Sequence, residues 1–160
     1  MDDGTPAPIG KACACLVDRH GRLLVFEHPG DRGMQLPKGT IEPGETPESA
    51  VRRELLEESG IAHGGPLQPL GSFERECDAG IEGNRVRHVQ LWHLFLMRLS
   101  GDLPERFEHV ASGSPEEDGL VFAFRWLAPG DPLDDFTLPY RQAIARVREA
   151  LDAPVGPPAP

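Results

Sequence analysis

Long hydrophobic runs are absent from this sequence of 160 residues. No window reaches the roughly 18 consecutive apolar residues of a membrane-spanning helix. The first residues, MDDGTPAPIGK, have neither the basic nor the apolar part of a signal peptide. We therefore expect a soluble, cytoplasmic protein with no membrane partner. Hydrophobic residues make up 39% of the chain and charged residues 26%, as in ordinary globular domains.

Cysteine is scarce, with three in the chain. An odd number excludes a framework in which every cysteine is paired in a disulfide. Cys13 and Cys15 alternate on a predicted strand, and the second ligand pair that a zinc site would need is missing. We interpret the pair as buried thiols.

Basic residues are in deficit, with 16 lysines and arginines against 26 aspartates and glutamates and a net charge of −10. Such a surface repels polyanions, which argues against non-specific binding of DNA or RNA. We expect a small-molecule partner and no nucleic acid. If that molecule is a phosphate ester, a divalent cation is the simplest way to neutralise it among so many carboxylates.

Hydrophobic periodicity predicts both strands and helices. The predicted strands span residues 11–18, 22–27, 67–76, 85–99 and 120–127. A helix is predicted over residues 47–59, with Thr46 as N-cap and Gly60 as the stop, and a second over residues 138–152. A Gly/Pro-rich loop is predicted over residues 28–33, and a short segment, MQLP, leads from it into the turn-rich segment KGTIEPGET, which we expect to be irregular and at the surface.

The order of strands, helix, strands, helix predicts an α/β protein of the α+β type, in which a mixed β-sheet is sandwiched between helices. Two predicted hairpins connect strands directly, so a doubly wound parallel fold fits less well. We expect one domain over residues 1–152, followed by a disordered proline-rich tail over residues 153–160.

Three carboxylates share one face of the first predicted helix. Glu54, Glu57 and Glu58 stand at positions i, i+3 and i+4. Like charges at this spacing repel one another, and a bound cation would relieve the repulsion. Oxygen ligands favour magnesium, calcium or manganese over zinc or copper. The alternative is that the sequence RRELLEE is a solvated helix face with ordinary charge pairs.

A wider pattern surrounds these carboxylates. It consists of Gly39, Glu45, Arg53, Glu54, Leu55, Glu57, Glu58, Gly60 and Ile61. This spacing resembles the Nudix box, G-x5-E-x7-R-E-U-x-E-E-x-G-U, in which U is aliphatic. Its chance occurrence in a chain of this length is on the order of one in a million. The resemblance implies a Nudix fold and a Nudix hydrolase.

The resemblance also implies a mechanism, in which water attacks phosphorus in a nucleoside diphosphate linked to another group. Glu54 and Glu58 would be the principal ligands of Mg²⁺, with Mn²⁺ as the alternative ion. The backbone carbonyl of Gly39 would join the metal shell. Glu57 would be either a further ligand or the catalytic base, and we favour the base. Arg53 would fix the rotamer of a carboxylate.

Outside these ligands the sequence offers weaker candidates. Lys38 lies in the segment LPKG, which resembles the lead-in of diadenosine polyphosphate hydrolases and some MutT-like enzymes. It would contact a substrate phosphate or be an ordinary surface lysine. Glu117 is a candidate for an extra acid, although no motif fixes its position. Trp92 and Tyr140 sit in apolar periodic patterns, which favours core packing over stacking on a base.

The leading interpretation is therefore a pyrophosphohydrolase of nucleoside polyphosphates, with dinucleoside polyphosphates and nucleoside triphosphates as the expected substrates. One alternative is a non-catalytic Nudix domain that senses nucleotides, which would be expected to lose box carboxylates. Another is a hydrolase of a non-nucleotide diphosphate, which the excess of acidic residues disfavours. The sequence leaves the oligomeric state open.

Overall fold

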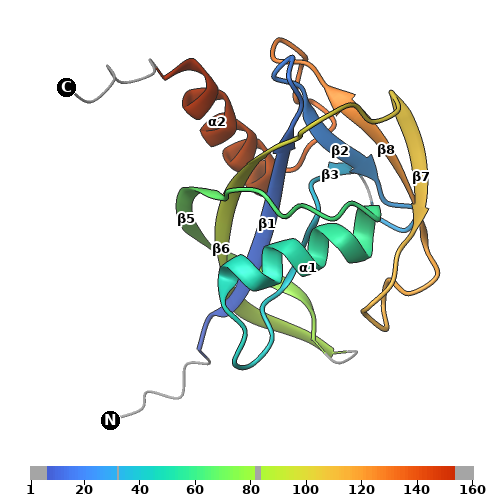
Figure 1. Ribbon diagram of the computed structural model, residues 1–160. Coiled ribbons are helices and arrows are strands. Elements are labelled where there is room, and N and C mark those ends of the chain that lie inside the picture. Colours follow the sequence, from blue (N-terminus) through green and yellow to red (C-terminus); the bar gives the residue numbers. More distant parts are fainter. Residues whose placement is uncertain (1–6, 32, 82–83, 154–160) are drawn as a thin grey trace.

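A mixed β-sheet with one helix on each face forms the body of the protein (Figure 1). The computed structural model describes residues 7–31, 33–81 and 84–153. The elements in these residues are β1 (Ile9–Val17), β2 (Leu23–Glu27), β3 (Met34–Gln35), β4 (Lys38–Thr40), α1 (Pro47–Ser59), β5 (Gln68–Ile81), β6 (Asn84–Arg98), β7 (Arg106–Val110), β8 (Val121–Leu127) and α2 (Leu138–Asp152). The predicted fold class is confirmed.

The sheet order is β5-β6-β1-β2-β8-β7, with β1 and β6 parallel and the other neighbours antiparallel. β1 pairs with β2 at one position, Val17 opposite Leu23. Beyond that point β4 pairs with β1, and β3 pairs with β2. The sheet therefore opens between these two pairs of strands, and the candidate site lies at this opening.

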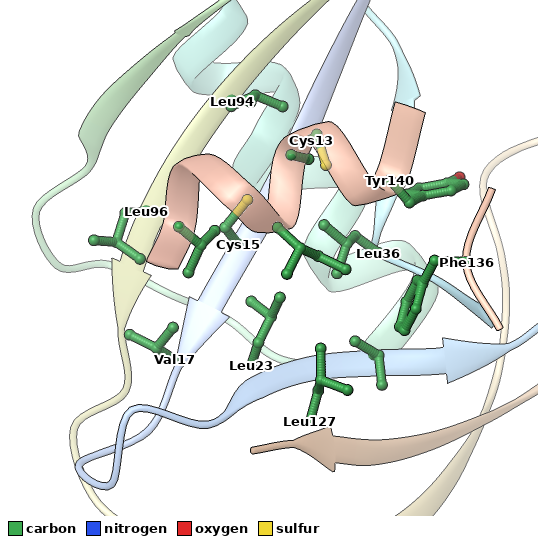
Figure 2. Packing of buried hydrophobic residues seen from close by; sticks show 14 of the residues in the cluster. Cys13, Cys15, Val17, Leu23, Leu36, Leu94, Leu96, Leu127, Phe136 and Tyr140 are labelled. Carbon is green, nitrogen blue, oxygen red and sulfur yellow. The ribbon is translucent and has the colours of Figure 1, made fainter. Parts of the chain in front are cut away.

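Strand β1 is buried on both of its faces, because one helix covers each side of the sheet. Its alternate side chains belong to two separate hydrophobic clusters. The cluster under α1 includes Ala12, Ala14, Leu16, Ala50, Val51 and Leu55. The cluster under α2, part of which is shown in Figure 2, includes Cys13, Cys15, Val17, Tyr140, Ile144 and Val147. Both strand cysteines are fully buried, which confirms the interpretation of this pair as core thiols.

The prediction of an irregular surface segment at KGTIEPGET is wrong in part, because β4 forms at its start. The MQLP segment before it contains β3, and its Leu36 is only 1% exposed. Strand β7 was not predicted, and β5 continues to Ile81, beyond the predicted strand end at residue 76, before β6 begins at Asn84. Each of these short segments gains its hydrogen bonds from a partner strand, which local periodicity does not reveal.

No helix within the described part of the chain is long and apolar enough to cross a membrane. The cytoplasmic location stays a prediction. So does the single domain over residues 1–152 with a disordered tail from residue 153, since residues 154–160 lie outside the described residues.

Candidate active site

Helix α1 presents the acidic face of the site, and its ends are fixed by local sequence. The Thr46 hydroxyl accepts a hydrogen bond from the Ser49 N–H at 3.1 Å. At the other end Gly60 adopts the left-handed conformation, with φ 77°, and its N–H donates to the Leu56 carbonyl. Both caps satisfy backbone groups that a helix terminus leaves unpaired. The helix therefore begins and ends as predicted.

Two of the three carboxylates on this face are buried. Glu54 is 8% exposed and Glu58 is 3% exposed, whereas Glu57 is partly exposed. Burial raises the pKa of Glu54, and burial together with the nearby Glu117 and Glu54 carboxyls raises the pKa of Glu58 well above its usual range. Ionising all of these groups is therefore costly unless a cation compensates.

Arg53 uses all five of its N–H donors. The Nε and one Nη2 donor bind the two carboxylate oxygens of Glu45, each at 2.8 Å. Nη1 donates to Glu54 at 2.8 Å and to Glu57 at 3.1 Å, and Nη2 also donates to the Thr40 carbonyl at 3.0 Å. The hydrogen bonds from Arg53 lower the pKa of Glu45 to about 2. Arg53 thus fixes the carboxylates around it and has no donor left for a ligand.

Two glycines allow backbone to lie directly against these carboxylates. A Cβ atom at Gly39 would overlap the carboxylate of Glu54, and a Cβ atom at Gly113 would overlap that of Glu57. The N–H of Lys38 donates to the Glu58 carboxylate at 3.2 Å. Each acidic side chain is therefore confined between the helix and a facing segment, and Gly39 lies where the sequence predicted a close backbone approach.

The residues fit the divalent cation that the Nudix resemblance implies. Glu54 and Glu58 are crowded, buried and chemically hard oxygen donors, and the missing side chain of Gly39 leaves its backbone beside Glu54. Within the described residues, no three acidic, histidine or cysteine side chains already surround one point as metal ligands. Glu54 and Glu57 instead accept hydrogen bonds from Arg53. The donor set thus has the right chemistry, although it is not prearranged around one point.

Two cavities adjoin at the opening of the sheet. The first, which we call the Arg53 cavity, has a volume of about 290 Å³ and is lined by Lys11, Lys38, Arg53, Glu54 and Gly113 among others. The second, the Tyr140 cavity, has a volume of about 350 Å³ and is lined by His28, Gln35, Lys38, Glu58 and Tyr140 among others. Lys38, Glu116 and Glu117 line both cavities. Together they form a cleft large enough for a small ligand.

Lys38 lines this cleft and does not lie on open surface. This position is the one that contact with a substrate phosphate would require. Its ammonium stands 4.5 Å from the centroid of the Trp92 ring and 5.7 Å from that of Tyr140. Burial lowers the pKa of Lys38. Both aromatic side chains belong to the core under α2, as predicted, and Tyr140 also lines the cleft.

The segment between β7 and β8 brings Glu117 into the cleft. Backbone hydrogen bonds join Ala111 to Leu120 at its base, and the Ser112 N–H donates to the Glu57 carbonyl at 3.1 Å. Burial, followed by repulsion from Glu54, raises the pKa of Glu117 to about 7. The structure therefore places the candidate extra acid beside the other carboxylates.

Among the residues of the cleft that sequence reasoning missed are Lys11 and Gly113. Lys11 was treated only as part of a strand, and Gly113 was not considered. The pairing of β1 with β4 brings Lys11 to the Arg53 cavity, and no local pattern announces that pairing. The turn-forming sequence around Gly113 was the available signal for a loop, but it did not indicate contact with Glu57.

Comparison with known proteins supports the similarity seen in the box. The family model described as NUDIX domain matches residues 8–147. The chain is 30% identical over 165 residues to the RNA pyrophosphohydrolase of Yersinia pestis (strain Pestoides F), an alignment that covers 98% of this chain and 88% of the relative.

Solved structures show the same fold at lower identity. The dihydroneopterin triphosphate pyrophosphohydrolase of E. coli has a TM-score of 0.65 at 19% identity, covering 88% of this chain and 97% of that one. The C. elegans Ap4A hydrolase has a TM-score of 0.58 at 16% identity, covering 92% of this chain and 100% of that one. At such identities the two structures support the fold alone.

Proposed function

The chain belongs to the Nudix hydrolase family, and from this premise we propose that it is a magnesium-dependent enzyme that cleaves a phosphoanhydride bond in a nucleoside polyphosphate. The observation that carries the proposal is the arrangement of the helix carboxylates around Arg53, whose five donors are all engaged. Glu54 and Glu58 therefore line one cleft at the opening of the sheet, and Arg53 links Glu57 to them.

In this proposal Glu54, Glu58 and the Gly39 carbonyl hold the cation, either Mg²⁺ or Mn²⁺. A bound cation would withdraw charge from phosphate oxygens and lower the pKa of bound water. Arg53 keeps Glu54 and Glu57 in place through its Nη1 donors.

Glu57 accepts the proton of the attacking water. It is more exposed than Glu54 and Glu58, with a side chain 21% accessible, so a water molecule reaches it more readily. The ammonium of Lys38 faces a substrate phosphate, and Glu117 supplies an additional carboxylate.

Nucleoside triphosphates and dinucleoside polyphosphates are the proposed substrates. A second candidate is the phosphorylated 5′ end of RNA, because relatives at about 30% identity are named RNA pyrophosphohydrolases. The net charge of −10 opposes extended contact with RNA, so only the end of the strand would enter the cleft. The absence of a nucleic-acid partner therefore stays a prediction.

The test is a turnover screen of the full chain with Mg²⁺ and with a chelator. The substrates are nucleoside triphosphates, dinucleoside polyphosphates, nucleotide sugars, ADP-ribose and an RNA oligonucleotide with a 5′ triphosphate. We expect Mg²⁺-dependent release of phosphate, pyrophosphate or a nucleotide from at least one polyphosphate substrate. Nucleotide binding without turnover on any of them would contradict the proposal and support the sensor alternative.

A further inference from the structure

Lysine is unusually rare in this chain, and both lysines lie in the same cavity. The sequence contains two lysines, Lys11 and Lys38, beside fourteen arginines. Both line the Arg53 cavity, although they are 27 positions apart in the sequence. Everywhere else the chain uses arginine as its basic residue.

The pairing of β1 with β4 explains how the two lysines meet. Lys11 stands opposite Thr40, and Cys13 stands opposite Lys38. Because side chains two positions apart on a strand share a face, both lysines lie on the same face of this strand pair. Their proximity is therefore built into the register of the sheet and does not depend on a flexible loop.

The two ammonium groups have unused hydrogen-bonding capacity. Lys11 donates to the Thr40 hydroxyl at 2.6 Å, which engages one of its three donors. The Lys38 ammonium packs over the Trp92 ring. In the described part of the chain, neither lysine forms a salt bridge with an aspartate or glutamate. An anion between the two groups would offset the repulsion between their positive charges.

Arg53 has no donor free to bind such an anion, because its five donors already bind protein oxygens. The carboxylates that would hold a cation also offset most of its positive charge, so little of that charge remains to attract phosphates farther away. A lysine ammonium is a compact charge with three rotatable donors, which suits phosphate oxygens that move during a reaction.

We propose that Lys11 is a substrate-binding residue. Together with Lys38 it holds those phosphates of the substrate's polyphosphate chain that lie away from the helix carboxylates. This inference rests on the proposed function and narrows it. Two lysine charges match chains of three or more phosphates better than the two phosphates of a nucleotide sugar or ADP-ribose.

The first test uses Lys11→Met, which keeps an unbranched side chain one atom shorter and removes its charge. The matched control is Arg19→Met, which removes an exposed positive charge in the turn between β1 and β2. Calorimetry without metal measures the Kd of inorganic tripolyphosphate and of pyrophosphate, and steady-state assays measure kcat and KM. We expect Lys11→Met to raise the tripolyphosphate Kd and the substrate KM about tenfold, the order of one charge-assisted hydrogen bond. The pyrophosphate Kd and kcat should change less, and the control should match wild type.

A second test does not depend on turnover. Pyridoxal 5′-phosphate combines an aldehyde with a phosphate, and borohydride reduction fixes it to a lysine amine. Mass spectrometry should find the label on Lys11 and Lys38, and tripolyphosphate should protect both. Lys11 labelled equally with and without tripolyphosphate would overturn the inference, as would wild-type tripolyphosphate affinity in Lys11→Met. Loss of binding in Lys11→Met, with no turnover by wild type, would instead uphold the lysine pair and reject the proposed hydrolase.

Discussion

Helix α1 and the segments that face it across the cleft hold their charged side chains in different ways. On the helix side, Arg53 is saturated with hydrogen bonds to Glu45, Glu54, Glu57 and the Thr40 carbonyl. On the facing side, Lys11 comes from β1, Lys38 from β4 and Glu117 from the segment after β7. Neither lysine has a carboxylate partner within salt-bridge distance among the described residues.

This difference separates two tasks. The hydrogen bonds of Arg53 keep Glu54 and Glu57 in place before any ligand arrives, and a cation would then gather the carboxylates around one point. Ammonium groups with free donors gain partners when an anion arrives, which suits substrate binding. Changes on the helix side should therefore affect turnover and folding stability together, whereas changes to the lysines should affect mainly substrate affinity.

The largest effect is expected from Glu58→Gln. Losing a cation ligand should lower turnover by about 100- to 1,000-fold, since metal catalysis contributes several kcal/mol and each 1.4 kcal/mol is a factor of ten. The same change replaces a buried carboxyl that is costly to ionise in the metal-free protein, so the metal-free Tm should rise. Glu48→Gln, on the exposed side of the same helix, should keep wild-type turnover. A Glu58→Gln enzyme with wild-type, Mg²⁺-dependent turnover would contradict the ligand assignment.

Arg53→Lys should give the next largest effect. Three lysine donors cannot replace five fixed ones, so the free energy of unfolding should fall by about 1–3 kcal/mol and turnover by at least about tenfold. Urea unfolding and steady-state kinetics measure both. For comparison, Lys11→Met should raise KM without lowering the unfolding free energy. Equal losses of unfolding free energy in the two variants would mean that Lys11 contributes to stability as much as Arg53 does, which would contradict the difference between the two sides of the cleft.

The two glycines of the cleft offer a finer comparison. Gly39→Ala and Gly113→Ala should each displace a carboxylate and lower kcat about tenfold. Gly113 also has a φ of 91°, in the left-handed region, so Gly113→Ala should destabilise the fold by about 1 kcal/mol more than Gly39→Ala. Gly101→Ala is the control for backbone strain alone, because Gly101 has a φ of 97° and a Cβ added there would have no neighbouring atom within 4 Å. If Gly101→Ala lowers kcat as much as Gly113→Ala, contact with Glu57 is not the cause.

Local sequence explains why the helix side was predictable. Helix α1 has the predicted bounds, Pro47–Ser59, because a capping threonine, a proline in the first turn and a terminal glycine define it within a few residues. The spacing of Glu54, Glu57 and Glu58 then places them on one face. Helix α2 also has its predicted bounds, Leu138–Asp152, since one apolar stripe runs along its length.

The facing side depends on contacts between distant segments. Lys11 reaches the cleft because β1 pairs with β4, and β4 is a strand of three residues with no periodicity to detect. Glu117 was named because it precedes the last predicted strand, where several Nudix enzymes supply an extra acidic residue, but its place beside Glu54 depends on the folding of the segment between β7 and β8. Gly113 depends on the same segment. The sequence thus predicts the half of the site that one helix carries, and the roles assigned to these residues stay predictions.

The smallest expected effect belongs to Glu117, whose pKa in the folded protein is raised to about 7. An acid with a raised folded pKa binds its proton more tightly when the chain is folded. The destabilising effect of its charge is therefore fully present above about pH 7 and disappears as the pH falls toward 4.5, the ordinary pKa of a glutamate.

In metal-free protein, the Tm of wild type should consequently rise relative to that of Glu117→Gln between pH 8 and pH 5, by a few degrees. The control is Glu116→Gln, at an exposed position in the same segment. Its Tm should change with pH as the Tm of wild type does. Added Mg²⁺ should reduce the difference between wild type and Glu117→Gln, because a cation bound nearby favours the ionised carboxylate. Parallel Tm curves for wild type and Glu117→Gln would place Glu117 in contact with solvent, and the facing side of the cleft would then contribute the two lysines without an acid.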